Sequence, residues 1–194
     1  VSPAVLIPRP ETELLVEQAL RRIPAESPGT VFDLGTGSGA LALAIAHERP
    51  RALVYATDSS RDALAVAAAN AVRLDLGHVE FRHGDWFAPL AGVAADVVVS
   101  NPPYVRVNDP HLAAGDLRFE PRAALAAGAD GLDAIRRIVA DAHRYLRRGG
   151  WLLLEHGHDQ GDAVRALLAG HGYTEIDQHR DMSGHDRVVS ARRA

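Results

Sequence analysis

The residues best suited to chemistry form one tetrapeptide, Asn101-Pro102-Pro103-Tyr104, directly after an almost wholly apolar run over 95–100. The Asn101 side-chain oxygen and the Pro102 carbonyl are two hydrogen-bond acceptors, and the proline rings restrict the backbone that carries them. Such a pair can receive both N–H bonds of a planar NH₂ group and free its lone pair for attack. We therefore predict that these four residues catalyse a reaction at a planar amide or amine nitrogen, with Tyr104 packed on the flat substrate group.

A glycine-rich segment follows another apolar run, over 30–34, and predicts a binding loop for a cofactor. Gly35, Gly37 and Gly39 allow a tight turn and a close approach of the backbone to a ligand. Asp58 comes 23 positions after Gly35, where an acid can accept hydrogen bonds from both ribose hydroxyls. The spacing is G-x-G-x-G, whereas dinucleotide-binding loops have G-x-G-x-x-G.

The pair Asp85-Trp86 fits an adenine ring, because the carboxylate can accept from the exocyclic amine and the indole offers an apolar face. The alternative for this pair is a capped turn with a half-buried tryptophan. Together with the tetrapeptide, these features predict S-adenosyl-L-methionine as the cofactor. The candidate cofactor-binding residues from these motifs are Asp33, Gly35, Thr36, Gly37, Ser38, Gly39, Asp58, Asp85, Trp86 and Asn101.

Strands and helices alternate along the chain in a way that would place these motifs together. Short apolar runs predict strands over 30–34, 52–57, 79–82, 95–100, 151–155, 173–178 and 188–191, the last two as an antiparallel pair. Helical periodicity predicts helices over 11–22, 40–48, 60–74, 132–146 and 163–169. This alternation is typical of an α/β fold with a mostly parallel sheet, and ligands bind at the carboxyl ends of such strands.

Capping residues and glycines set the expected ends of these helices. Thr12 is a candidate cap for the first helix, and Ser59 or Ser60 for the third. Gly149-Gly150 should stop the helix over 132–146. The segment over 105–128 is too long for a plain connection and suggests a lid or a substrate loop, with disorder as the alternative.

Composition fits an ordinary globular domain and excludes several classes of protein. The 194 residues are 47% hydrophobic, contain no cysteine and carry a formal net charge of −4, which argues against stable nucleic acid binding. Neither a membrane-spanning run nor a signal peptide is apparent, which favours the cytoplasm and no membrane partner. His156 and His158 lack a third ligand at useful spacing, so we expect no metal.

Several motifs together resemble one known family, the peptide chain release factor N(5)-glutamine methyltransferases (the PrmC/HemK family). The likeness runs from end to end. Its motifs are Ile7-Pro8-Arg9-Pro10-Glu11-Thr12-Glu13, Asp33 to Gly39, Asp85-Trp86, Ser100 to Tyr104, Arg118-Phe119-Glu120-Pro121 and Leu154-Glu155-His156-Gly157.

The resemblance implies a Rossmann-like class I methyltransferase fold, with a seven-stranded sheet whose last strand is antiparallel. It implies transfer of a methyl group from S-adenosyl-L-methionine to the glutamine of a Gly-Gly-Gln loop in release factors, the protein partners. It also implies that Arg9-Pro10 sits beside the cofactor, and it favours partner contacts for Arg118 and Glu120 over a local ion pair.

Two further expectations concern domains and competing functions. Residues 1–194 should form one catalytic domain with a lead-in segment and helix over 1–24, without the N-terminal docking domain that family members usually carry. The tetrapeptide alone would equally suit a nucleic-acid methyltransferase acting on adenine N6 or guanine N2. A cofactor-binding module without catalysis and a dinucleotide dehydrogenase are weaker alternatives, since neither needs both the tetrapeptide and this glycine spacing.

Overall fold

The computed structural model describes every residue except 27, 114 and 116–118. Arg118, for which we expect a partner contact, lies outside the described residues. The first five strands are β1 (Thr30–Leu34), β2 (Leu53–Asp58), β3 (Glu80–His83), β4 (Ala95–Ser100) and β5 (Leu146–Glu155), and the last two are β6 (Tyr173–Arg180) and β7 (Asp186–Arg193). The helices are α1 (Thr12–Leu20), α2 (Ala40–Glu48), α3 (Arg61–Arg73), α4 (Arg122–Leu125), α5 (Asp133–Ala142) and α6 (Gly161–Gly170), with short 3-10 turns η1 (Ala88–Leu90) and η2 (Pro110–Ala113).

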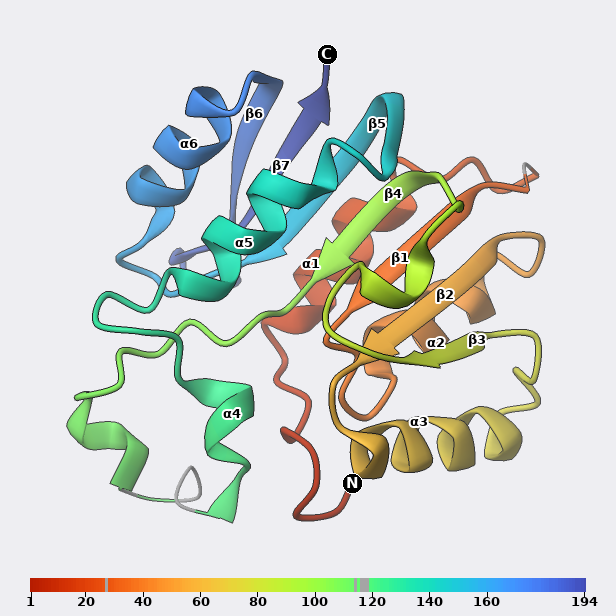
Figure 1. The fold of residues 1–194 in the computed structure, drawn as a ribbon, viewed down its shortest axis with the longest axis horizontal. Helices are drawn as coiled ribbons and strands as arrows, with labels where there is room; N and C mark the ends of the chain where they lie inside the picture. Colours follow the sequence, from red (N-terminus) through yellow and green to blue (C-terminus); the bar gives the residue numbers. More distant parts are fainter. Residues whose placement is uncertain (27, 114, 116–118) are drawn as a thin grey trace.

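The strands form one seven-stranded sheet in the order β3-β2-β1-β4-β5-β7-β6 (Figure 1). Each neighbouring pair from β3 to β5 is parallel, and β7 runs antiparallel to both β5 and β6. The mostly parallel sheet with an antiparallel last strand, expected from the sequence, is confirmed. The chain order reverses at β1 and β4, so their carboxyl ends border a crevice where ligands bind in folds of this kind.

Helices cover both faces of the sheet because the central strands are apolar on both sides. On one face, Val97 and Val99 of β4 pack with residues of α1 and α2. On the other, Val98 packs with residues of α5 and α6. Figure 1 shows α5 in front of the sheet and α1 and α2 behind it. The two apolar layers fix the strands, and the strands in turn fix the loops at their carboxyl ends.

The largest errors in the sequence-based boundaries lie at the end of the helix predicted over 132–146 and at the start of the strand predicted over 151–155. The helix predicted over 132–146 ends at Ala142, and Leu146 begins β5, pairing with Ala95 of β4. Gly149 and Gly150 therefore lie inside a strand and do not stop a helix. A Cβ atom on Gly150 would lie 2.9 Å from the Asp96 carbonyl oxygen, so the close approach of β5 to β4 accounts for this glycine.

The helix caps gave one correct and one wrong prediction. Ser60 caps α3, with its hydroxyl accepting from the Ala63 N–H at 3.2 Å. Thr12 does not cap α1, since the capping position falls on Glu11 and the Thr12 hydroxyl bonds elsewhere. Among the described residues, none of the helices is long and apolar enough to cross a bilayer.

Candidate functional site

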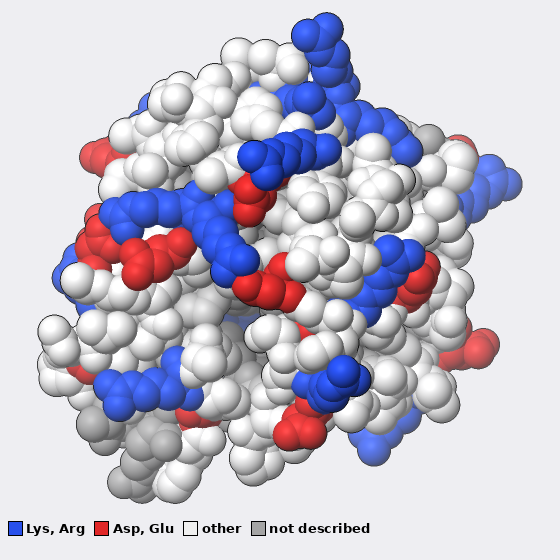
Figure 2. All heavy atoms as spheres, in the orientation of Figure 1, with Lys and Arg blue, Asp and Glu red and all other residues white. Residues whose placement is uncertain are grey.

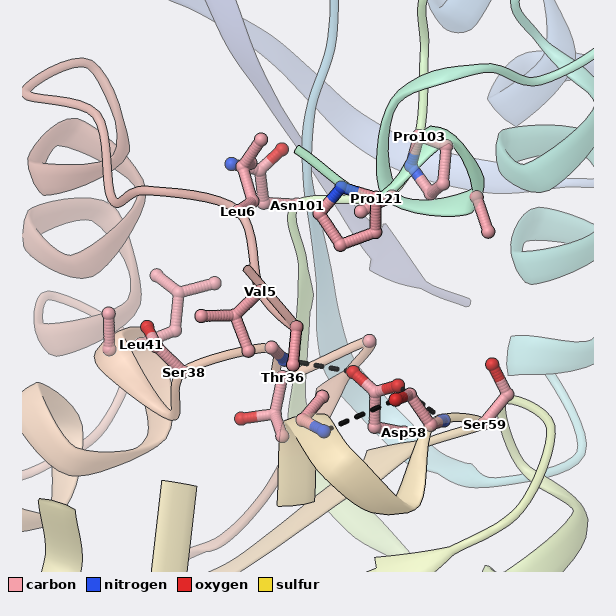
Figure 3. A pocket seen from close by; sticks show the side chains of 18 of the residues that line it. Val5, Leu6, Thr36, Ser38, Leu41, Asp58, Ser59, Asn101, Pro103 and Pro121 are labelled. Atoms are coloured by element: carbon pink, nitrogen blue, oxygen red, sulfur yellow. Dashed lines mark hydrogen bonds between the residues drawn. The ribbon is translucent and has the colours of Figure 1, made fainter. Parts of the chain in front are cut away.

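A cavity of about 300 Å³ lies at the carboxyl ends of β1, β2 and β4. Its walls come from segments far apart in the sequence: the lead-in at 4–8, the glycine loop, the loop after β2, Asp85-Trp86, the end of β4 and the residues around α4. Figure 3 shows Thr36 and Asp58 at one end of this space and Asn101, Pro103 and Pro121 at the other. The glycine loop and the tetrapeptide thus share one cavity.

The glycine loop takes a conformation that suits few other residues. Gly35, Gly37 and Gly39 have φ values of 71°, 55° and 83°, in the left-handed region that glycine adopts without steric cost. A Cβ atom on Gly35 would lie 3.3 Å from the Trp86 ring. The bare backbone of Gly35 therefore lets the indole pack directly against the loop, beside the cavity.

Asp58 connects the ends of β1 and β2. One of its carboxylate oxygens accepts from the Gly37 N–H at 2.9 Å, and the other accepts from the Ser60 N–H at 2.8 Å (Figure 3). Each carboxylate oxygen has a further lone pair, so Asp58 can hold the loop and still accept from the hydroxyls of a ligand. Asp58 thus ends β2 and lines the cavity, as the sequence analysis expected of an acid at this position.

Asp85 and Trp86 both line the cavity, at the end of β3. The Asp85 carboxylate also forms an ion pair with Arg137 of α5 at 2.6 Å. The Trp86 carbonyl accepts from the Thr57 hydroxyl at 2.9 Å, and Trp86 has a left-handed φ of 48°. This anchored turn presents the indole to the cavity.

The tetrapeptide divides between the cavity and the core. Asn101 and Pro103 line the cavity, whereas Pro102 is buried and Tyr104 packs against the apolar cluster below α5. The Tyr104 hydroxyl donates to Glu155 at 3.1 Å. Burial and the nearby Glu155 carboxylate raise the pKa of Tyr104 well above its usual value. In this structure Tyr104 packs behind the tetrapeptide and does not line the cavity.

Other candidate residues also lie outside the cavity lining. Asp33 is fully buried and accepts from the Thr36 hydroxyl at 2.6 Å and the Ala42 N–H at 3.1 Å, so it holds the glycine loop against α2. Burial raises the pKa of Asp33 to about 7. Gly39 packs on α3, where a Cβ atom would lie 3.1 Å from the Ala67 Cβ.

The lead-in covers the cavity and is tied to the segment after β4. Arg9 pairs with Glu120 at 2.6 Å, and neither Arg9 nor Pro10 lines the cavity, although Pro8 does. Glu120 therefore pairs with an arginine 111 positions away, and the partner contact expected for it stays a prediction. The sequence offered no signal that Val5 and Leu6 would line the cavity, because their apolar side chains look like those of any core segment.

His156, directly after β5, has hydrogen-bond partners within the protein. Both ring nitrogens of the buried His156 have hydrogen-bond partners, the Gly157 carbonyl at 2.8 Å and the Gln178 amide at 2.7 Å. Burial lowers the pKa of His156. Within the part of the chain that the structure describes, no group of three or more His, Asp or Glu side chains is arranged to hold a metal ion.

Comparison with known proteins identifies the family. The Methyltransferase small domain family matches residues 10–120. A release factor glutamine methyltransferase of Xylella fastidiosa (strain 9a5c) is 57% identical over 99% of this chain and 70% of that protein. One from Salmonella typhimurium (strain LT2) is 50% identical over 99% and 69%. The chain belongs to the release factor glutamine methyltransferase family.

A solved structure agrees with this assignment. A release factor-specific protein-(glutamine-N5) methyltransferase of Alicyclobacillus acidocaldarius is 34% identical, covers 100% of this chain and 98% of that one, and has a TM-score of 0.61. The class I methyltransferase fold expected from the sequence is thereby confirmed. The cavity also fits S-adenosyl-L-methionine. The glycine loop, the Asp58 carboxylate and the Trp86 indole line it, and its volume is in the range of small-ligand sites.

Proposed function

We propose that this protein transfers a methyl group from S-adenosyl-L-methionine to the side-chain amide nitrogen of the glutamine in the Gly-Gly-Gln loop of peptide chain release factors. The observation that carries this proposal is the shared cavity, in which Asn101 lies across from the glycine loop and Asp58 (Figure 3). Family membership supports the same reaction. The substrate would be met in the cytoplasm, where translation terminates.

The cofactor would lie along the glycine loop, with its methionine part at Gly35 to Ser38, its ribose at Asp58 and its adenine at Trp86. When bound, it supplies a methyl group on a positively charged sulfur atom. The protein contributes a glycine loop whose conformation is already fixed before the cofactor binds. The loop is fixed by Asp33 and Asp58 through hydrogen bonds from Thr36 and Gly37.

At the other end, the tetrapeptide would hold the substrate amide. Among the described residues, neither the Asn101 side-chain oxygen nor the Pro102 carbonyl accepts a hydrogen bond. Asn101 lines the cavity, so its oxygen is available to a ligand, whereas Pro102 is buried outside the cavity lining and its role as second acceptor stays a prediction. If both acceptors held the N–H bonds of the substrate, they would orient its amide nitrogen toward the methyl group that the cofactor supplies. The bound cofactor would supply the methyl group, Asn101 would hold the substrate nitrogen toward it, and the methylated nitrogen would lose one proton to water. In-line positioning is the main source of rate in such a site.

The charge distribution supports a protein substrate over a nucleic acid. Several arginines form ion pairs with neighbouring acids, among them Arg136 with Asp130 and Arg147 with Asp96. Figure 2 shows basic and acidic side chains interspersed on one face of the molecule. A base-flipping enzyme relies on extended contact with phosphates, for which an excess of basic charge is usual.

The deciding experiment incubates the protein with methyl-labelled S-adenosyl-L-methionine and either a release factor or duplex DNA. We expect label on the release factor, at the glutamine of its Gly-Gly-Gln loop, and none on a release factor whose glutamine is replaced. Asn101→Ala should lower the rate by ~10²–10³ with cofactor affinity nearly intact. Label on DNA alone would overturn the proposed substrate, and loss of cofactor binding in Asn101→Ala would overturn the role given to Asn101.

A further inference from the structure

Polar side chains from three distant segments form a continuous series of hydrogen bonds that starts at Asn101 and Thr12, which line the cavity, and runs behind its wall to Glu155. Asn101, after β4, donates through its Nδ2 to the Thr12 hydroxyl at 3.1 Å. The Thr12 hydroxyl, at the start of α1, donates to Glu155 Oε2 at 2.8 Å. Glu155, at the end of β5, receives the Tyr104 hydroxyl on its other oxygen, Oε1, at 3.1 Å.

The directions of these bonds follow from the acceptor at the end of the chain. Burial raises the pKa of Glu155. In its ionised form this carboxylate can only accept hydrogen bonds, so the single Thr12 proton is then used toward Glu155. The Thr12 oxygen is then available only as an acceptor, and Asn101 must turn its NH₂ group to it. The two ends of the Asn101 amide are thereby distinguished, and its Oδ1 is left for the cavity.

This orientation matters because the substrate group is itself an NH₂. If the Asn101 amide were reversed, it would present donors to a donor, and the substrate nitrogen would lose the acceptor that orients it. For an asparagine side chain without such a partner, the two orientations of the amide are similar in energy. Glu155 is 1% exposed, at the end of an apolar run. Reversing the Asn101 amide would draw the Thr12 proton away from this buried carboxylate, and a buried charge without its hydrogen bond is costly.

We propose that Thr12 and Glu155 are positioning residues that act through Asn101, by fixing which end of its amide faces the substrate. The inference rests on the proposed function, because it takes the Asn101 oxygen as the acceptor of the substrate amide. Glu155 fixes the direction of the Thr12 hydroxyl proton, and Thr12 thereby fixes which end of the Asn101 amide donates to it. Both residues lie in motifs that the sequence analysis associated with the family, but neither was a candidate site residue there.

The first test measures the Asn101 side chain itself, in protein free of cofactor and substrate. The sequence contains three asparagines, at positions 70, 101 and 108, so selective ¹⁵N-asparagine labelling yields three pairs of side-chain NH₂ signals. Thr12→Val removes the hydroxyl without changing side-chain shape. Loss of one hydrogen bond should speed exchange of the Asn101 NH₂ protons about tenfold. Asn70, which donates to the Ser38 carbonyl, is the internal reference and should not change.

A matched variant separates this effect from a general loss of stability. Thr57→Val also removes a buried threonine hydroxyl, one that donates to the Trp86 carbonyl. It should cost comparable stability while leaving Asn101 exchange as in the wild type. Thr12→Ser, which keeps the hydroxyl, should restore slow exchange. If Thr12→Val and Thr57→Val alter Asn101 exchange equally, the proposed orientation of Asn101 by Thr12 is wrong.

The second test asks whether Thr12 acts through Asn101 in the reaction. Thr12→Val should lower kcat about tenfold, with KM for the release factor and calorimetric cofactor affinity within a factor of two to three. In an Asn101→Ala background, the same substitution should have no further effect on kcat. An equal loss in both backgrounds would overturn the proposal.

Glu155→Gln tests the same series of hydrogen bonds from the Glu155 end. It replaces the first test if Thr12→Val does not fold. A glutamine amide can donate to Thr12, which frees the threonine proton to turn toward Asn101. We expect faster Asn101 exchange and a lower kcat, and unchanged values of both would overturn the proposal. If the wild type does not methylate a release factor, the proposed function fails, while the exchange experiment still decides how Asn101 is oriented.

Discussion

Arg9 and Glu120 form an ion pair at 2.6 Å that joins the lead-in to the segment before α4. The Glu120 side chain is only 3% exposed, and the Arg9 side chain is 34% exposed. Residues on both sides of the pair, Pro8 and Pro121, line the cavity. The pair therefore holds two walls of one binding site together.

We expect Arg9→Gln to loosen both walls. The change leaves the buried Glu120 carboxylate without its cation, at a cost of about 1–3 kcal/mol. Hydrogen exchange should quicken over 4–10 and 119–126, and calorimetry should show weaker cofactor binding. Arg9→Gln combined with Glu120→Gln should be less harmful than Arg9→Gln alone, because no buried charge then remains. A double variant as damaged as the sum of the two singles would rule out this interaction.

The Gly35 backbone should matter for both stability and binding. Gly35→Ala places a side chain at a φ of 71° and against the Trp86 ring, 3.3 Å away. A left-handed backbone costs an alanine roughly 1–2 kcal/mol, and the displaced indole should also weaken cofactor binding. The matched control is Gly92→Ala, with a φ of 81° and open space around its Cβ position. Chemical denaturation should show similar losses for both, whereas calorimetry should show weaker binding for Gly35→Ala alone.

Asp58 should contribute directly to cofactor affinity. Asp58→Ala removes the acceptor of the Gly37 and Ser60 N–H groups together with the proposed ribose acceptor, so binding should weaken by ~1–3 kcal/mol. Asp62→Ala, in the exposed first turn of α3, is the control and should bind as the wild type does. Unchanged calorimetric affinity in Asp58→Ala would reject the ribose assignment.

Asp33 should make folding stability depend on pH in the ligand-free protein. Burial raises its pKa to about 7 in the folded state, against 3.8 as the ordinary value. A group with a raised folded-state pKa contributes fully below its unfolded pKa, and the contribution is lost as pH rises through the folded value. The unfolding free energy of the wild type relative to Asp33→Asn should therefore fall from pH 4.5 to about 7 and then level off.

Urea denaturation of both proteins at a series of pH values measures this difference. Asp62→Asn removes an exposed carboxylate and should give a nearly constant difference over the same range. A constant difference for Asp33→Asn as well would show that Asp33 is ionised in the folded protein at all these pH values.

Local patterns were enough to predict the strands and the edge of the sheet that carries the site. The apolar run Ala95–Ser100 and the helix Ala40–Glu48 have the predicted bounds. Asp58 and Asn101 end or follow parallel neighbours of β1, so their meeting at one crevice followed from topology alone. These features depend on near neighbours in the sequence, which is why a single sequence reveals them.

Long-range partners were not predictable in this way. Thr12 looked like a helix cap, and only the folded chain shows its hydrogen bond to Glu155, 143 positions away. The helical period over 132–146 continues past Ala142, and pairing with β4 overrides it from Leu146 onward. Tyr104 was expected over the substrate, but its hydroxyl reaches the buried Glu155 instead.

The placement of β7 has a consequence for how the protein is made. β7 is last in chain order, yet it is inserted between β5 and β6, and its removal would leave both without a neighbour on that side. During synthesis, the edge of β5 stays bare until residues 186–193 have emerged. A bare strand edge invites pairing with other chains. We therefore expect early termination before Asp186 to yield aggregates rather than a smaller working enzyme.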